Sequence, residues 1–103
     1  MLITTSDTIP GKNIEALGLV QGNVVTSTHI GRDLMANLKT IVGGEVKQYT
    51  EMTNNARQMA EERMVDQATA MGADAVVAFR FGGESVLQGT SEFMAYGTAV
   101  KYI

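Results

Sequence analysis

The first third of the chain has the composition of β-strands. Residues 1–5 are predicted to form a short edge strand, and a Pro-Gly pair within 9–12 is typical of a turn. From 14 to 28, valine and leucine lie among threonine and glycine, which predicts a long strand. Gly18 and Gly22 interrupt it and favour a bulge, a bend or a close approach of another backbone.

Helical periodicity replaces this pattern in the middle of the chain. Apolar residues spaced by four, four and three predict a helix over 29–42, which the glycine pair at 43–44 would end. A longer helix is predicted over 48–71, with Gly72 at its C-cap. Its predicted buried stripe consists of small and flexible residues: Met52, Ala56, Ala60, Met64, Ala68 and Met71.

The last third alternates with a period of two and predicts a β-hairpin with a turn near 88–90. The glycine pair at 82–83 is interpreted as a kink or bulge in the first arm. In the same arm, Arg80 lies on a strand expected to be central, where its charge needs a partner such as Glu84 or Glu92.

Both faces of the second arm are apolar. Met94, Tyr96, Val100 and Tyr102 fall on one face, and Phe93, Ala95, Gly97, Ala99 and Ile103 fall on the other. One face can pack on the long helix, and the other needs a different cover. We expect that cover to be a neighbouring subunit.

Length and composition narrow the possibilities further. The 103 residues suffice for a single domain, 1–103, with one core. Only 18% of the residues are charged, which suggests self-association, and the net charge is −3 without any basic run. We therefore expect no nucleic-acid partner and no membrane partner, and a cytoplasmic location.

Several short segments, taken in order, resemble the YbjQ-like family of small bacterial proteins, which have no assigned function and carry a heavy-metal-binding label. The segments are Thr4-Thr5 with Pro10-Gly11, Gly18 to Gly22, Gly31-Arg32-Asp33, Ile41 to Glu45, Tyr49, Ala56-Arg57, Gly72 to Val77 and Tyr96 to Val100. The resemblance spans essentially the whole chain. It implies an α+β fold, a two-layer β-α-β-β unit with a three-stranded antiparallel sheet packed on a long helix. It also implies that the subunit is similar to that of dodecin and that it assembles into a homopentameric ring.

The family label directs attention to metal ligands. The chain has no cysteine and one histidine, His29, so a soft metal site would have to gather His29 from several subunits around the ring axis. Asp33 and Glu45 could supply oxygen ligands to a hard cation, as could Asp74 and Glu84. The alternatives to metal binding for these residues are helix capping and exposure to solvent.

No arrangement typical of an enzyme is present in the sequence. A catalytic triad would need the single histidine, and neither glycine pair is followed by the Lys-Ser/Thr of a phosphate-binding loop. The sequence thus predicts a non-catalytic ring that holds a metal ion or small ligand. The alternative, suggested by the dodecin-like subunit, is sequestration of a flat aromatic cofactor such as a flavin against Tyr96, Tyr102 or Phe93.

Overall fold

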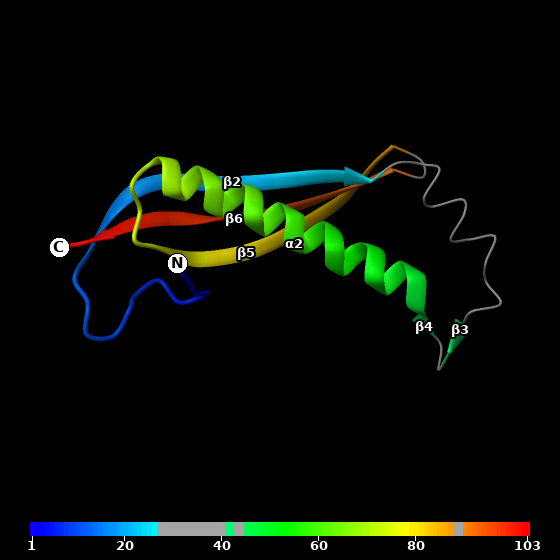
Figure 1. Cartoon of the computed structure of the whole chain (residues 1–103), viewed down its shortest axis with the longest axis horizontal. Helices are drawn as coiled ribbons and strands as arrows, with labels where there is room; N and C mark the ends of the chain where they lie inside the picture. The colour runs from blue at the N-terminus through cyan, green and yellow to red at the C-terminus, as the bar shows by residue number, and fades with distance from the viewer. Residues whose placement is uncertain (27–40, 43–44, 88–89) are drawn as a thin grey trace.

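The computed structural model describes the backbone of residues 1–26, 41–42, 45–87 and 90–103 (Figure 1). One long helix packs on a four-stranded sheet. The elements are β1 (Leu2–Ile3), β2 (Ile14–Thr26), β3 (Ile41–Val42), β4 (Glu45–Val46), α2 (Lys47–Ala70), β5 (Ala75–Leu87) and β6 (Thr90–Tyr102). The predicted edge strand, long strand, long helix and hairpin are therefore confirmed.

The sheet is mixed, not the three-stranded antiparallel sheet implied by the family resemblance. Its order is β1-β5-β6-β2, and β1 runs parallel to β5 while the other pairs are antiparallel. The backbone N–H of Thr4 donates to the Val76 carbonyl oxygen at 3.0 Å, which extends this parallel pairing. The chain then turns at the Pro-Gly segment, where Lys12 N–H donates to the Ile9 carbonyl, and enters β2.

The helix predicted over 29–42 falls on residues outside the described part of the chain, apart from its last two. These two, Ile41 and Val42, form β3 and pair with Val46 and Glu45 of β4, so the predicted helical end is wrong. The physical reason lies in the local sequence. Branched residues on either side of a Gly-Gly pair favour a tight hairpin over a helix terminus.

The core lies between α2 and the sheet. Small or flexible side chains on one helix face, Ala60, Met64 and Ala68, pack against the sheet residues Val20, Val76, Phe79, Ala95 and Ala99. Small residues on both sides let the helix approach closely. Gly22 shows how closely, because a Cβ atom there would lie 2.5 Å from the Met64 backbone nitrogen. The expected role of Gly22 is confirmed.

The helix ends as the sequence predicts. Gly72 has a φ of 78°, and its N–H donates to the Thr69 carbonyl while Ala73 N–H donates to the Ala68 carbonyl. This pair of bonds is the Schellman arrangement, which satisfies the last carbonyls of a helix. Met71 lies beyond the helix and is 40% exposed, so its predicted place in the buried stripe is wrong.

Three irregularities interrupt the pairing of the long strands, one in β2 and two in β5, of which the second lies between Ser85 and Leu87. The bulge expected at Gly18 is present between Ala16 and Gly18. The glycine pair at 82–83, by contrast, pairs regularly with Met94 and Phe93, and β5 is bulged between Val77 and Arg80 instead. Ala78, inside that bulge, adopts a φ of 53°.

The sheet face opposite α2 is covered only in part by the described chain. Near the start of β5, Val77 and Val100 are buried against Ile9 of the N-terminal segment and against Ile14 at the start of β2. The chain thus supplies part of the cover that we expected from a neighbouring subunit. Farther along the strands, Leu19 and Tyr96 remain exposed. We call this uncovered half the open face.

Candidate functional site

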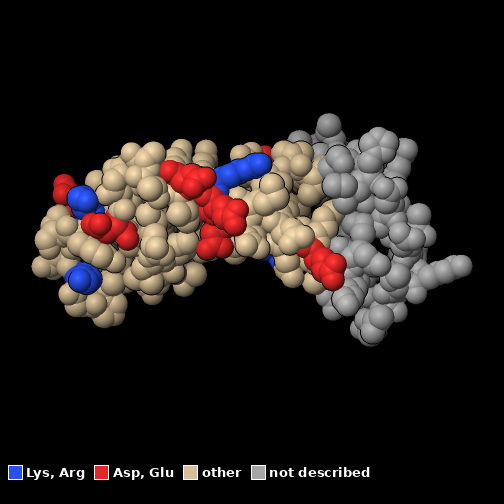
Figure 2. Space-filling model, viewed as in Figure 1, with Lys and Arg blue, Asp and Glu red and all other residues tan. Residues whose placement is uncertain are grey.

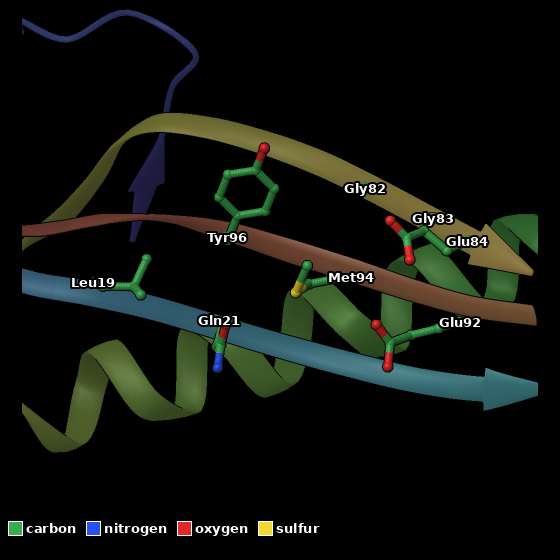
Figure 3. A pocket seen from close by; sticks show the side chains of 8 residues that line it. All are labelled: Leu19, Gln21, Gly82, Gly83, Glu84, Glu92, Met94 and Tyr96. Atoms are coloured by element: carbon green, nitrogen blue, oxygen red, sulfur yellow. The ribbon is translucent and has the colours of Figure 1, made fainter. Parts of the chain in front are cut away.

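A shallow groove of about 490 Å³ lies on the open face (Figure 3). It crosses the three long strands. Its lining residues are Leu19 and Gln21 of β2, Gly82, Gly83 and Glu84 of β5, and Glu92, Met94 and Tyr96 of β6.

Strand register places these side chains together. Residues directly opposite each other in an antiparallel pair project from the same face. Tyr96 stands between Gln21 on β2 and Arg80 on β5. Two residues before Tyr96 in β6, Met94 is opposite Gly82. Because Gly82 has no side chain, the floor of the groove is hollow there.

One end of the groove is acidic. Glu84 and Glu92 are directly opposite each other on β5 and β6, and both side chains point over the sheet at the same end of the groove (Figure 3). The Nδ2 atom of Asn23 on β2 donates to Glu92 Oε2 at 3.4 Å, a long hydrogen bond. Like charges directly opposite in a sheet destabilise it, so this end of the groove favours a positive group between the carboxylates.

The other end of the groove is apolar. The Leu19 side chain and the Tyr96 ring lie over the sheet there, and the Met94 thioether lies between this end and the carboxylates (Figure 3). The groups in the groove that could coordinate a metal ion are therefore two carboxylates, an amide and a thioether. This set fits a divalent cation bound mainly through oxygen and does not fit a thiolate site.

The residues proposed from sequence as metal ligands are not brought together by the described structure. His29 and Asp33 lie outside the described residues. Glu45 is in β4, and its side chain also lies outside them. Within the part of the chain that is described, no three histidine, cysteine, aspartate or glutamate residues gather closely enough to hold a metal ion.

The two further carboxylates considered from sequence have different surroundings. Asp74 has a structural role, because its Oδ2 atom accepts from Tyr102 N–H at 2.8 Å and lies 3.7 Å from Lys101 Nζ. Glu84 lines the groove.

The ion pair expected for Arg80 is not formed within the described chain, and a partner across a subunit interface stays a prediction. The Arg80 Nη1 atom donates to the carbonyl oxygens of Thr5, at 3.0 Å, and Phe79, at 2.7 Å. No ion pair joins Arg80 to Glu84 or Glu92 among the described residues. The side chain is exposed, so it needs no buried counter-charge and instead fastens the N-terminal segment to β5. The acidic pair is left without this cation.

The aromatic residues expected to stack a flavin, Tyr96, Tyr102 or Phe93, do not share one face of the sheet. Phe93 pairs with Val24 and Gly83 on the helix side of the sheet, whereas Tyr96 and Tyr102 lie on the other side. The Tyr102 ring is occupied by the Lys12 ammonium group, 5.0 Å from its centroid. The three aromatic residues therefore do not form one stacking surface.

Sequence reasoning missed Met94 and Glu92 as members of one site with Glu84. Glu92 was considered only as a partner for Arg80. Pairing across the hairpin brings residues of the two arms face to face, but the register that sets Glu84 opposite Glu92 depends on a bulge between Ser85 and Leu87, which the hydrophobic pattern does not show.

The helix-bearing face has an acidic surface of its own. Figure 2 shows acidic side chains gathered along the middle of the helix, where Glu61, Glu62 and Asp66 line a shallow depression with Gln58 and Val65. These carboxylates lie on successive turns of one exposed helix, a usual position for solvated charges. They provide matched control positions for experiments on the groove.

None of the described helices has both the length and the apolar character required to span a membrane.

Comparison with known proteins gives the family. The model of a family described as "Putative heavy-metal-binding", YbjQ, matches residues 1–103. A UPF0145 protein of Vibrio parahaemolyticus is 60% identical over 100% of this chain and 99% of its own length. A UPF0145 protein of Thermotoga maritima is 52% identical over 98% of this chain and 96% of its own.

A crystal structure shares the fold. It is that of a protein of unknown function of the DUF74 family from Pediococcus pentosaceus, with a TM-score of 0.70 and 14% identity over 100% of this chain and 98% of the other. The expected likeness to the dodecin subunit is not shown by these comparisons. Sequence matches over the full length, supported by the shared fold, place this chain in the YbjQ family.

Proposed function

We propose that this chain is a cation-binding module, with the groove on the open face as its site and a divalent metal ion as its ligand. The observation that carries the proposal is the placement of Glu84 directly opposite Glu92. A cation between the two carboxylates would relieve their repulsion. The description of the family as heavy-metal-binding agrees with this role.

The proposed module works as a homo-oligomer. One chain offers two carboxylates in the groove, whereas oxygen-bound divalent ions usually take six or more ligands. Water or oxygen ligands from a neighbouring subunit would complete the shell. Leu19, with 67% of its surface exposed, and Tyr96 at the other end of the groove from the acidic pair give the open face the apolar character of an interface. The ring of five implied by the family resemblance is the assembly we propose.

Metal titration of the purified protein without a histidine tag tests this function. We expect Zn²⁺ or Mn²⁺ to bind with a fixed stoichiometry in isothermal titration calorimetry. Glu84→Gln with Glu92→Gln should abolish that binding, since the variant keeps the shape of the groove and removes both charges.

The matched control is Glu61→Gln with Glu62→Gln, which removes the same two charges from the helix. It should bind as the wild type does. Equal binding by both double variants, or loss of binding in the helix variant alone, would place the ion elsewhere and refute the proposal.

A further inference from the structure

β2 is an edge strand of the described sheet, and its outer edge is long. It is 13 residues in length and pairs with β6 on its inner side. No described strand pairs with its outer side. An edge of this kind presents unpaired N–H and C=O groups, which invite pairing with the strand of another molecule.

Two side chains of α2 occupy the middle of this edge. The Gln21 N–H donates to Gln67 Oε1 at 2.7 Å, and Arg63 Nη1 donates to the Asn23 carbonyl oxygen at 2.6 Å. These hydrogen bonds lie on either side of Gly22, where the helix backbone is closest to the strand.

The two side chains take the places that a second copy of β2 would fill. If two β2 strands paired antiparallel with Gly22 opposite Gly22, the Gln21 N–H would meet the Asn23 carbonyl of the other copy. In the described chain, the Gln67 side-chain oxygen replaces that carbonyl, and the Arg63 guanidinium replaces the N–H that would meet Asn23.

The same alignment is self-complementary in its side chains. It would set Leu19 of one copy opposite Val25 of the other, and these residues are 67% and 57% exposed. An apolar cross-strand pair would therefore form on each side of the centre.

We infer that Arg63 and Gln67 act as a guard of the β2 edge: by occupying its hydrogen-bonding groups, they prevent β2 from pairing with β2 of a second copy of this chain. The guard is independent of the groove, because it uses the edge of the sheet and not its open face. The guard disfavours association of two copies through pairing of their β2 strands.

Hydrogen exchange and mass measurement on the full chain test the guard. In Arg63→Ala with Gln67→Ala, the Gln21 amide should exchange about fivefold faster at low protein concentration, since it loses one hydrogen bond. At high concentration the same amide should become protected, and light scattering should show a species larger than that of the wild type. Gln67→Ala alone should reproduce the faster exchange.

The control variant is Arg57→Ala with Gln58→Ala. It removes the same two residue types from the same helix, where they bond to Asn54 and Glu62 and not to the sheet. It should keep the wild-type mass and Gln21 exchange. Adding Val25→Lys to the guard variant should restore the wild-type mass.

Unchanged Gln21 exchange in a folded guard variant would overturn the inference. A wild-type mass for that variant at every concentration would also overturn it, as would association that Val25→Lys leaves intact.

Discussion

At the scale of single residues, Gly22 has the least room for a side chain among the described glycines. A Cβ atom there would lie 2.2 Å from the Ala60 carbonyl oxygen, and both neighbours it meets on the helix backbone are rigid. The helix crosses β2 at this point because no side chain intervenes. Any larger residue would have to lift α2 from the sheet.

Gly22→Ala should therefore lower the free energy of unfolding by about 3 kcal/mol, the upper end of the cost of overpacking, because backbone cannot move aside as a side chain can. Urea unfolding followed by circular dichroism measures it. Gly82→Ala is the control, since its Cβ would have its nearest contact at 3.7 Å, on the Tyr96 ring. Similar losses for the two variants would contradict the close approach at Gly22.

Residue types alone indicated which glycines end the helix, permit close packing or mark the bulge in β2, but not where β5 bulges. Gly72 and Gly18 adopt the positive φ angles for which glycine is suited. The first bulge in β5 lies instead at Ala78, a residue without that preference. Tertiary pairing, here between Ala78 N–H and the Ser6 carbonyl, decides its position and cannot be derived from the local sequence.

At the scale of elements, the helix α2 organises the core through a stripe of small and flexible residues. Met64 is fully buried among sheet residues, whereas Met59, five residues earlier on the same helix, is 43% exposed. The stripe was predictable from helical periodicity because long helices repeat regularly.

Met64→Ala should destabilise the protein by about 3 kcal/mol, since it leaves a cavity at the centre of the core. Met59→Ala, which removes the same atoms from a partly solvated site, should cost under about 1 kcal/mol. Thermal unfolding of the two variants checks the difference. Equal costs would mean that the face of α2 against the sheet has been assigned wrongly.

The pairing of β5 with β6 shows why the candidate site could not be predicted from sequence. Next to the turn, Leu87 pairs with Thr90, and a regular hairpin from that pair would set Glu84 opposite Phe93. A bulge between Ser85 and Leu87 shifts the register, so that Glu84 faces Glu92. One inserted residue, invisible in the hydrophobic pattern, thus creates the acidic pair.

At the scale of the whole molecule, the two sheet faces differ in how they are covered. The helix covers one face, and the N-terminal segment covers part of the other, leaving Leu19 and Tyr96 exposed at the apolar end of the groove. The sequence correctly indicated that the second face needs a cover. It could not show that Ile9, in the turn before β2, supplies part of that cover, because this contact joins distant parts of the chain.

If copies of the chain associate through the open face, Leu19→Lys should reduce the mass observed by native mass spectrometry. The charge would be buried in the interface without a partner, which is strongly unfavourable. Met59→Lys places the same charge at an exposed apolar position on the opposite layer and should leave the assembly unchanged. An unaltered mass for Leu19→Lys would rule out this face as the interface.

If a cation relieves the repulsion between Glu84 and Glu92, the effect will be seen in urea unfolding with and without Zn²⁺. Without metal, Glu84→Gln should be more stable than the wild type by about 0.5 kcal/mol, because the opposed charges are removed. With Zn²⁺ the order should reverse, since the ion stabilises the folded wild type and has lost its site in the variant. The control Glu61→Gln should follow the wild type in both conditions. If Glu84→Gln and the wild type are equally stable without metal and gain equally from Zn²⁺, the account is contradicted.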